Sequence, residues 1–505
     1  MKQIIDEFFE RAEEFPNKMA IICESESISY ESLAIKIMTY AHFFDEVGIQ
    51  KGDHIGFPMN NSIDSAAIMF ACAEVGCALV PFNLTLQSEA VRSTFRNGNV
   101  KHIIAKKNFL RQMSEWDEIS VEGVTICIDA EYDGCYTLLG ANEARERLNT
   151  NRDGNELFIL TTTSGSTGNP KPIMLSQNNK MNRARVHINH YQLSSSDVIL
   201  AATPLYHSLA ERLVIMPLIL GATCIILPRF TPAKWLECIE KNGVTFTIAV
   251  SAQLGQVVEL LTQTDKYCLK SLRCVVSSSA ALENSIREKL VDVLECDFHE
   301  MYGTSEISTA TDNLFEKSEK NQHSVGKCLN GVSIKIIDEE GRECEVGQVG
   351  EITCRTSLVC SGYYGMQDVF EQSCVDGYFK TGDMGYMDED GYLYFSGRKK
   401  EVIITGGINV YPLDIESCVS AIDGVAECAA FACEDDKLGE VVGVAIVNRN
   451  DSAVTLRDVR VHCAKNLADF QQPHQIYFLS ELPKNSMGKL VRAKIPEMIS
   501  KQGGM

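Results

Sequence analysis

The stretch TTTSGSTGNPKP, residues 161–172, indicates a chemical function more clearly than any other part of the chain. It follows the apolar run LFILT (157–161) and precedes a short apolar run at 173–175, so it is expected to connect two strands. Its glycines and small hydroxyl residues let N–H and O–H groups converge on an anion, and Lys171 adds a positive charge. No G-K-[ST] follows the glycines, which excludes a Walker A loop. The stretch therefore predicts an anion-binding loop of another type.

Beyond this loop, short apolar runs alternate with longer amphipathic ones. The runs VILAA (198–202), TCIIL (223–227), FTIAV (246–250) and CVVS (274–277) are expected to be buried strands, as is LFILT before the loop. Residues 256–263 and 283–295 are expected to be helices. Alternation of helices with nearly continuous apolar strands predicts parallel-rich sheets in an α/β protein.

The pattern changes in the last third of the chain. Between 331 and 395, short alternating strands with glycine and acidic turns predict a small antiparallel, barrel-like β subdomain. After 401, predicted strands at 425–433 and 441–447 and a helix at 455–467 fit a small α+β domain. The charged segment GRKKE (397–401) is the expected joint. We therefore predict a large domain over 1–398, α+β overall, and a small mobile domain over 399–505.

Composition excludes several classes of protein. The chain has 505 residues, with 47 Lys and Arg against 68 Asp and Glu, and its net charge is −21. That charge disfavours nucleic acid and anionic lipid as partners. The N-terminus shows no signal peptide, and the apolar stretch 213–228 is short for a membrane span and is interrupted by Pro217 and Gly221. The 19 cysteines include no C-x-x-C pair, which favours reduced thiols and a cytoplasmic location.

Five further motifs follow the loop in order: PLYHS (204–208), MYGTSE (301–306), YFKTGD (378–383), GRKKEVIITGGINVYP (397–412) and PKNSMGK (483–489). With the loop, they resemble the adenylate-forming superfamily, which includes acyl- and aryl-CoA synthetases, adenylation domains of peptide synthetases and beetle luciferases. Weaker matches at ISYESLA (28–34) and CALVPFN (77–83) extend the resemblance over nearly the whole chain. The acyl- or aryl-CoA ligase branch is the most similar.

The resemblance implies ATP, Mg²⁺ and coenzyme A as cofactors. Thr304 would donate to a phosphate, and Glu306 would hold Mg²⁺ through its carboxylate. The Tyr302 ring would stack on the base. Asp383 and Arg398 would bind the ribose. The residues expected to bind nucleotide are Thr163, Ser164, Gly165, Ser166, Thr167, Gly168, Lys171, Ser279, Ala280, Tyr302, Gly303, Asp383 and Arg398.

Two lysines are given different roles by the resemblance. Lys489 would stabilise the charge that develops when a carboxylate attacks the α-phosphate of ATP. Lys400 would be the hinge about which the small domain turns between two half-reactions. The turn would withdraw Lys489 and present the segment 401–410, where backbone near Gly406 and Gly407 would form the approach for the thiol.

The sequence indicates the acid substrate less specifically than it indicates the nucleotide. His207 in PLYHS stands where amino-acid-activating domains place an Asp, so we expect an acid other than an α-amino acid. In SSSAAL (277–282), Ser278 and Ser279 replace glycines that usually line the acyl pocket, which predicts a narrower or more polar pocket.

These observations predict an AMP-forming ligase that joins a small-molecule carboxylic acid to a thiol, with coenzyme A as the expected acceptor. The segment 457–501 has eight Lys and Arg against four Asp and Glu, which suits either CoA phosphates or an acidic carrier protein. A ligase that loads an acyl carrier protein in lipid or natural-product biosynthesis therefore stays open. A nucleotide-binding sensor without catalysis is a second alternative, although Lys489 and Glu306 are both present.

Overall fold

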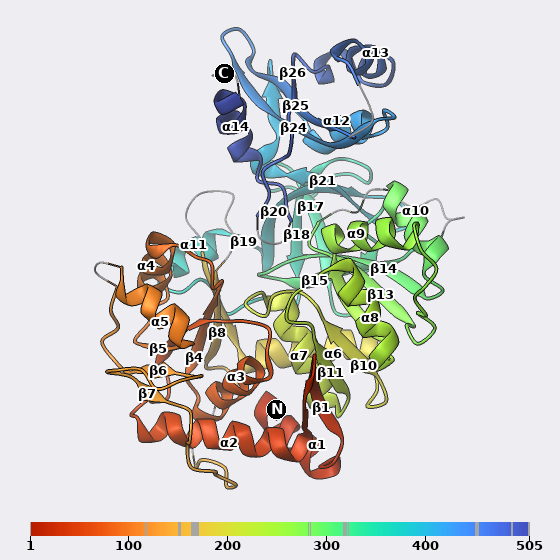
Figure 1. Cartoon of the computed structure of the whole chain (residues 1–505). Coiled ribbons are helices and arrows are strands. Elements are labelled where there is room, and N and C mark those ends of the chain that lie inside the picture. Colours follow the sequence, from red (N-terminus) through yellow and green to blue (C-terminus); the bar gives the residue numbers. More distant parts are fainter. Residues whose placement is uncertain are drawn as a thin grey trace. The chain divides into compact units, whose positions relative to one another are not determined.

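The computed structural model describes residues 2–116, 119–149, 153–162, 171–280, 282, 284–316, 321, 323–449, 454–485 and 488–502 (Figure 1). The chain divides into two compact units. Unit 1 is Met1–Ser318 with Thr356–Ser373, and unit 2 is Glu319–Arg355 with Cys374–Met505. Most of the β subdomain predicted over 331–395 thus falls in the same unit as the C-terminal residues. The boundary that we place at 398/399 stays a prediction.

Unit 1 contains two parallel-rich sheets, as predicted. The strands that unit 1 contributes to the first sheet run β15-β14-β13-β12-β10-β11-β1-β2; the inner ones are parallel, and the outermost two, β15 and β2, pair antiparallel with β14 and β1. The predicted strand at 246–250 is reproduced by β12, and β10, β11 and β13 match within a residue or so. The strands are β1 (Met19–Cys23), β2 (Glu26–Ser29), β10 (Val198–Ala201), β11 (Thr223–Ile226), β12 (Phe246–Val250), β13 (Cys274–Ser278), β14 (Asp297–Thr304) and β15 (Ser308–Leu314).

The second sheet of unit 1 runs β7-β6-β5-β3-β4-β8-β9. All neighbouring strands are parallel except β8 and β9, which pair antiparallel from Leu157↔Ser176 to Thr162↔Pro172. The predicted phosphate loop therefore joins the two strands of a hairpin. The strands are β3 (His54–Pro58), β4 (Ala78–Phe82), β5 (His102–Ala105), β6 (Thr125–Cys127), β7 (Tyr136–Thr137), β8 (Leu157–Thr162) and β9 (Pro172–Ser176).

Helices cover these sheets, and their ends follow standard capping chemistry. In α8, the Thr231 hydroxyl accepts the Lys234 N–H, Pro232 stands in the first turn, and Gly243 ends the helix at φ +62°. Figure 1 shows α8, α9 and α10 beside β13 and β14, and Trp235 and Leu254 lie in the core they share. The helices are α1 (Ile4–Glu14), α2 (Tyr30–Glu46), α3 (Ile63–Val75), α4 (Ser88–Asn97), α5 (Lys107–Ser114), α6 (Gln177–His190), α7 (Ser208–Leu220), α8 (Pro232–Asn242), α9 (Ser251–Leu261), α10 (Asn284–Val293) and α11 (Gln367–Gln372).

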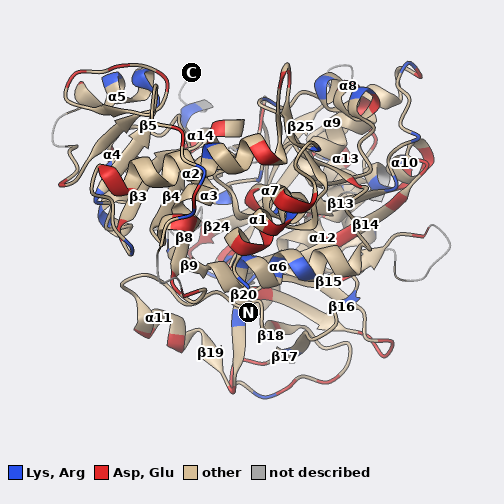
Figure 2. Ribbon diagram, turned by 90° about the horizontal axis from the view of Figure 1, so that it is seen from below, with Lys and Arg blue, Asp and Glu red and all other residues tan. Residues whose placement is uncertain are grey.

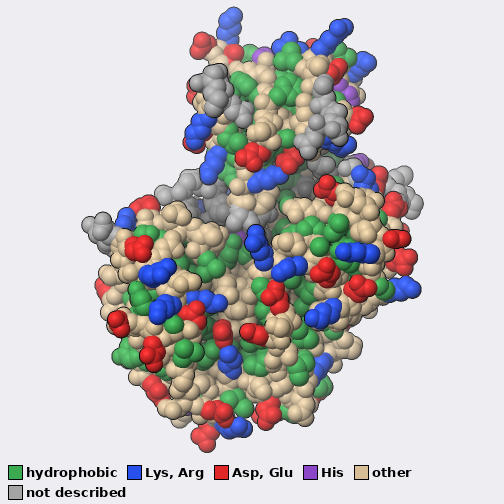
Figure 3. Space-filling view, viewed as in Figure 1, with side chains coloured by type: hydrophobic (Ala, Val, Ile, Leu, Met, Phe, Trp, Pro, Cys, Tyr) green, Lys and Arg blue, Asp and Glu red, His purple; other side chains and the backbone are tan. Residues whose placement is uncertain are grey.

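The apolar stretch 213–228 forms part of buried α7 and strand β11, as predicted. In the part of the chain that the structure describes, no helix has both the length and the apolar character needed to cross a membrane. All 19 cysteines are free thiols. Basic and acidic positions are interspersed along the ribbon in Figure 2 and over the face shown in Figure 3.

Unit 2 contains an antiparallel sheet of β17-β18-β20-β19 in which β21 also pairs with β20, so the antiparallel β region predicted over 331–395 is present and extends to Arg398. A second sheet, β23-β22-β25-β24 with β26 beside β25, packs on α12 and α13 around Ile415, Val444 and Val459. The elements are β16 (Lys327–Cys328), β17 (Ser333–Ile337), β18 (Gly350–Arg355), β19 (Cys374–Val375), β20 (Tyr378–Met387), β21 (Leu393–Arg398), β22 (Ile403–Thr405), β23 (Ile408–Val410), α12 (Pro412–Ser420), β24 (Val425–Asp435), β25 (Gly439–Asn448), α13 (Leu456–Asn466), β26 (Gln475–Phe478) and α14 (Ile495–Gln502), with short 3-10 turns that include Lys399–Glu401 and Arg492–Lys494.

Candidate active site

The motif MYGTSE lies at the end of β14 and in the turn that leads into β15. Gly303 pairs with Thr309 across this hairpin, and a Cβ at 303 would come within 1.7 Å of the Ser308 carbonyl oxygen. Only glycine fits such a close approach of two backbones. Tyr302 is nearly buried in the strand, at 8% exposure, while Thr304 and Glu306 are half-buried. The turn therefore presents Thr304 and Glu306 from a tightly closed hairpin.

Buried arginines hold this turn in place. The Arg183 guanidinium donates to the carbonyls of Ser305 (3.0 Å) and Glu306 (2.7 Å), and its Nε donates to the Leu358 carbonyl (2.9 Å). Burial lowers the pKa of Arg183 to about 10, so the side chain stays charged at neutral pH. Arg212 on α7 donates to the Ser308 hydroxyl (2.9 Å). Sequence reasoning missed Arg183, because its neighbours Asn182 and Arg185 make the segment resemble an exposed helix.

Tyr363 connects two of the predicted residues. Its hydroxyl donates to Glu306 Oε1 (2.9 Å), and the Lys171 ammonium lies 4.6 Å from the centre of its ring. Tyr363 bridges to Ile173 of β9, which places it beside the strand that follows the phosphate loop. Lys171 and Glu306 are thus gathered around one aromatic side chain that sequence reasoning missed. The loop residues Thr163, Ser164, Gly165, Ser166, Thr167 and Gly168 lie outside the described residues.

His207 immediately precedes helix α7 and donates its backbone N–H to the Pro204 carbonyl (3.0 Å). Its ring lies against Tyr206, with ring centroids 4.4 Å apart. The ring atom Nε2 is buried and has no hydrogen-bond partner among the described residues. Burial lowers the pKa of His207 to about 4, so the imidazole is neutral at pH 7. A neutral ring with an unused nitrogen is suited to a ligand that can donate or accept one hydrogen bond.

Ser279 and Ala280 are exposed in the turn after β13. Ser279 has φ +78°, in the left-handed region that glycine occupies freely and that L-residues rarely adopt. The Ser251 hydroxyl braces this turn by donating to the Ala280 carbonyl (2.5 Å). Serine therefore occupies a backbone conformation suited to glycine, at the position where the resemblance expects glycine.

In unit 2, the two expected ribose residues are cross-strand neighbours. Asp383 on β20 pairs in register with Arg398 on β21, and Arg398 Nε lies 2.9 Å from Asp383 Oδ1. The backbone N–H of Asp383 also donates to the Thr381 hydroxyl (3.1 Å). Asp383 is buried, at 2% exposure, whereas Arg398 is partly exposed. The structure thus brings together two residues that stand 15 positions apart in the sequence.

Lys489 lies in the same electrostatic environment. Burial lowers its pKa most, followed by the charge of Arg398, while Asp383 and Glu401 act in the opposite direction. The loop that carries it is closed by paired backbone and side-chain bonds: Asn485 donates to the Lys489 carbonyl (2.9 Å), and the Lys489 N–H donates to Asn485 Oδ1 (3.0 Å). Gly488 has φ +74°, which accounts for the glycine in PKNSMGK.

The expected joint is anchored on both sides of Lys400. Lys399 forms an ion pair with Glu351 of β18 (2.7 Å), and Glu401 pairs with Arg492 (3.1 Å). Arg492 also makes a bidentate contact with Glu416 of α12, at 2.7 Å to each oxygen. Lys400 itself is exposed between these two anchors.

Gly406 and Gly407 form the tip of the hairpin between β22 and β23. Thr405 pairs with Ile408, and the two glycines have φ +56° and +85°. A two-residue loop with both φ values positive is a type I′ turn, which strongly prefers glycine. Both glycines are exposed, and Ile404 and Ile408 beside them are about half exposed.

The chain is similar to known proteins over most of its length. Residues 8–364 match the AMP-binding enzyme family, and residues 414–489 match the AMP-binding enzyme C-terminal domain. The chain belongs to the AMP-binding enzyme family.

Among its relatives, the indoleacetate–CoA ligase of Aromatoleum aromaticum is 28% identical, with 96% of each chain covered. The fatty acid–[acyl-carrier-protein] ligase ScoC of Streptomyces coeruleorubidus is 26% identical over 96% of this chain and 94% of that one. The o-succinylbenzoate CoA synthetase (MenE) from Bacillus subtilis, solved with its acyl-adenylate intermediate, is 26% identical with a TM-score of 0.86 over 98% of each chain.

Proposed function

We propose that this chain activates a carboxylic acid with Mg·ATP and transfers the acyl group to coenzyme A. In the first step the carboxylate attacks the α-phosphate, giving an acyl-adenylate and pyrophosphate. In the second step the CoA thiol attacks the acyl carbon, giving a thioester and AMP. The observation that carries the proposal is the grouping of Asp383, Arg398 and Lys489 in unit 2 of a chain in the AMP-binding enzyme family.

Each residue of this group has a defined task in the proposal. The Asp383 carboxylate accepts from the ribose hydroxyls, and Arg398, its cross-strand partner, orients that carboxylate. Lys489 contacts carboxylate and α-phosphate oxygens and offsets the charge that accumulates between them. Hydrogen bonds with Asn485 hold the backbone of Lys489, which suits a task that depends on the position of its side chain.

Unit 1 would supply the residues that contact the phosphates and the acid. A carboxylate such as that of Glu306 is the ligand type that Mg²⁺ prefers, and Tyr363 fixes its orientation. When bound, Mg²⁺ would neutralise phosphate charge. Lys171 and Thr304 would contact phosphate oxygens. His207, neutral and with Nε2 available, would lie beside the acyl group rather than bind an ammonium.

The change Glu306→Gln tests the metal assignment. A neutral amide is a weaker Mg²⁺ ligand than a carboxylate, so we expect the mutant to need roughly tenfold or more Mg²⁺ for half-maximal pyrophosphate release. Adenosine binding should change little. Glu316→Gln, on an exposed glutamate after β15, is the control. A Mg²⁺ titration that overlays that of the wild type would remove Glu306 from the metal site.

Pyrophosphate release across a panel of fatty, aryl, dicarboxylic and β-amino acids tests the proposed activity. The proposal expects release that depends on one class of acid, followed by thioester formation when CoA is added. Release from no acid in a broad panel would contradict the activity and favour a non-catalytic nucleotide-binding protein.

A carrier-protein ligase is the second candidate, supported by the relative ScoC and by basic residues of α13. Arg457, Arg460 and Lys465 are exposed on this helix, whereas Lys484 and Arg492 of the same basic segment are paired with acids. Holo carrier protein and CoA should be offered to the enzyme with the same acid. Transfer to the carrier alone would select this candidate.

A further inference from the structure

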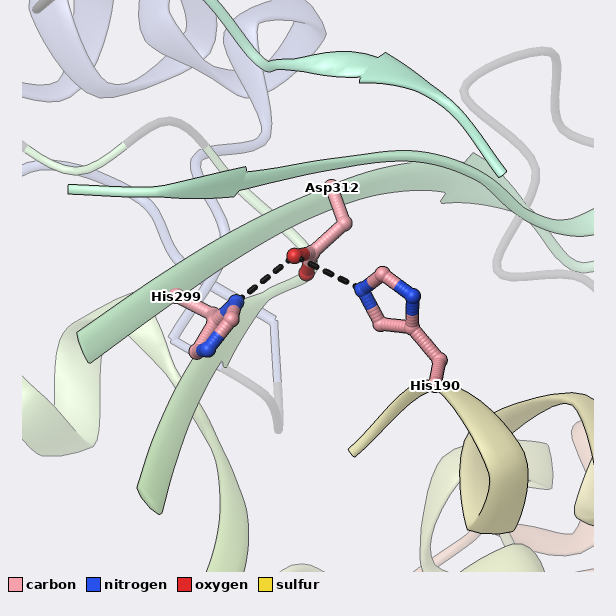
Figure 4. A group of neighbouring side chains, drawn as sticks. All are labelled: His190, His299 and Asp312. Atoms are coloured by element: carbon pink, nitrogen blue, oxygen red, sulfur yellow. Dashed lines mark hydrogen bonds and ion pairs between the residues drawn. The ribbon is translucent and has the colours of Figure 1, made fainter. Parts of the chain in front are cut away.

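We propose that His190, His299 and Asp312 form a binding site for a divalent transition metal, with Zn²⁺ as its expected occupant (Figure 4). One nitrogen of each histidine and one oxygen of the aspartate lie within 4.8 Å of one another. None of these residues has a task in the proposed reaction, and the site is separate from the Mg²⁺ position assigned to Glu306. The two sites can therefore be tested independently.

The fold brings the three residues together from separate elements. On the hairpin of β14 and β15, His299 pairs with Leu314 and Met301 pairs with Asp312. His299 and Asp312 are thus diagonal neighbours on the same face of the sheet. His190 is the last residue of α6 and points toward them from outside the sheet (Figure 4). Ligands that are carried by regular elements, two strands of one hairpin and the end of a helix, favour a fixed arrangement.

The distances between the three side chains are close to those of a metal site. His299 Nδ1 lies 2.6 Å and His190 Nε2 lies 3.0 Å from the same atom, Asp312 Oδ2. Around a tetrahedral Zn²⁺ with bonds of about 2.0–2.1 Å, ligand atoms lie about 3.3–3.4 Å apart. To admit the ion, His299 Nδ1 and His190 Nε2 must each move less than about 1 Å away from Asp312 Oδ2. The two imidazole nitrogens, which lie within 4.8 Å of each other, must reach the same spacing. His190, whose side chain is 35% exposed, has room to make this adjustment.

The surroundings of Asp312 are those of a ligating carboxylate. The Tyr191 hydroxyl donates to the other oxygen, Oδ1 (2.8 Å), which orients Oδ2 toward the two imidazoles. Such outer contacts commonly fix the ligands of metal sites.

The chemistry of the donor set selects the class of metal. Two imidazole nitrogens with one carboxylate oxygen suit Zn²⁺, Co²⁺, Ni²⁺ or Cu²⁺, whereas Mg²⁺ and Ca²⁺ prefer oxygen ligands. Asp312 is almost fully buried, so the ion would enter from the side of His190 and complete its coordination there with water. A bound ion would join the end of α6 to the hairpin that carries Tyr302 and Thr304.

Isothermal titration of chelator-treated, fully reduced protein with Zn²⁺ tests the site. We expect one Zn²⁺ per chain in the wild type and at least about tenfold weaker binding in His190→Ala and in His299→Gln. His190→Ala changes a partly exposed helix end and should fold normally. The control is His474→Ala, an exposed histidine in unit 2, which should leave Zn²⁺ binding unchanged.

Visible absorption of the Co²⁺ form supplies a readout that does not depend on activity. The proposal expects d–d bands from a nitrogen and oxygen site in the wild type and in His474→Ala, and their loss in His190→Ala. Equal Zn²⁺ binding by the wild type and by a His190→Ala/His299→Gln double mutant would overturn the proposal. Co²⁺ bands that show thiolate ligands and persist in that double mutant would also overturn it, because they would place the ion at cysteines.

Discussion

At the scale of single residues, two side chains of the candidate site have unusual properties: the pKa of His207 and the backbone conformation of Ser279. His207 is a neutral imidazole because burial lowers its pKa to about 4. Ser279 holds a left-handed backbone conformation at φ +78°. Both properties have consequences that can be measured in the free protein, without knowledge of the acid.

The first prediction concerns acid stability. The folded-state pKa of His207, about 4, lies below the ordinary value of 6.5, so the unfolded chain binds this proton more readily between those values. The contribution of His207 to stability is therefore complete above pH 6.5 and is lost as the pH falls toward 4. His207→Gln should lose less stability over this window than the wild type, by on the order of 2 kcal/mol.

Urea unfolding at pH 7.0 and at pH 4.5 measures this difference. His474→Gln, which changes an exposed histidine, is the control and should behave like the wild type. Equal losses of stability in the wild type and in His207→Gln would show that His207 is not held neutral by burial.

The second prediction concerns Ser279. A non-glycine residue in the left-handed region costs about 1–2 kcal/mol, so Ser279→Gly should raise the free energy of unfolding by about 1 kcal/mol after the added chain entropy of glycine is subtracted. Ser278→Gly, one residue earlier at the end of β13, should destabilise by a similar amount. If thermal or urea unfolding finds Ser279→Gly no more stable than Ser278→Gly, the turn is not strained.

At the scale of elements, α6 is the main support of the MYGTSE turn. It carries Arg183, which fixes the carbonyls of Ser305 and Glu306. The helix begins with a reciprocal capping box between Ser176 and Asn179 directly after β9. One short segment therefore connects the strand that follows the phosphate loop to the turn that presents Glu306.

The third prediction follows from this support. Lysine at position 183 would keep the charge but could not reach carbonyls in several directions at once. Since a hydrogen bond to a charged group contributes about 1.5–3 kcal/mol, Arg183→Lys should lower the free energy of unfolding by about 2–4 kcal/mol and raise KM for Mg·ATP. Arg185→Lys, on a partly exposed arginine of the same helix that pairs with Glu7, should change stability by less than about 1 kcal/mol.

Comparable destabilisation by Arg183→Lys and Arg185→Lys, with no change in KM for either, would show that α6 does not hold the turn. Unfolding in urea and initial rates of pyrophosphate release give the two readouts from the same preparations.

Much of this fold was predictable because buried parallel strands give short apolar runs. The strands β10 to β13 and the helix α13 lie within a residue or so of their predicted ranges. Helix α9 begins at Ser251, five residues before its prediction, because SAQLG resembles a turn in sequence. Gly255 lies in that helix, and a Cβ there would come 3.4 Å from Ile286 on α10. Packing between two helices depends on residues far apart in the chain, so the sequence around Gly255 does not reveal it.

Contacts between distant segments also limited what could be predicted of the candidate site. Motif order predicted Asp383 and Arg398, and the register of β20 with β21 explains why they meet. Arg183 and Tyr363 were missed because each acts through contacts with segments more than 50 residues away. Nor did the sequence single out His190, His299 and Asp312, which meet only where the end of α6 lies against the folded hairpin of β14 and β15.

At the scale of the whole molecule, the proposed reaction assigns different steps to different parts of unit 2. Lys489 serves adenylate formation, and the exposed hairpin at Gly406 and Gly407 serves the approach of the thiol. Lys400 stands between an anchor to the antiparallel sheet, Lys399 with Glu351, and an anchor to the C-terminal segment, Glu401 with Arg492. If these assignments hold, a mutation can impair one half-reaction and spare the other.

The most direct measurement compares the two half-reactions in Lys489→Ala. Adenylate formation is followed by acid-dependent exchange of pyrophosphate into ATP, and thioester formation is followed from a synthetic acyl-adenylate and CoA. We predict that the first rate falls roughly 10²–10³-fold while the second stays within about twofold of the wild type. Lys484→Ala, which changes an exposed lysine in the same loop, should leave both rates nearly unchanged. Equal loss of both half-reactions in Lys489→Ala, or full retention of adenylate formation, would contradict the account.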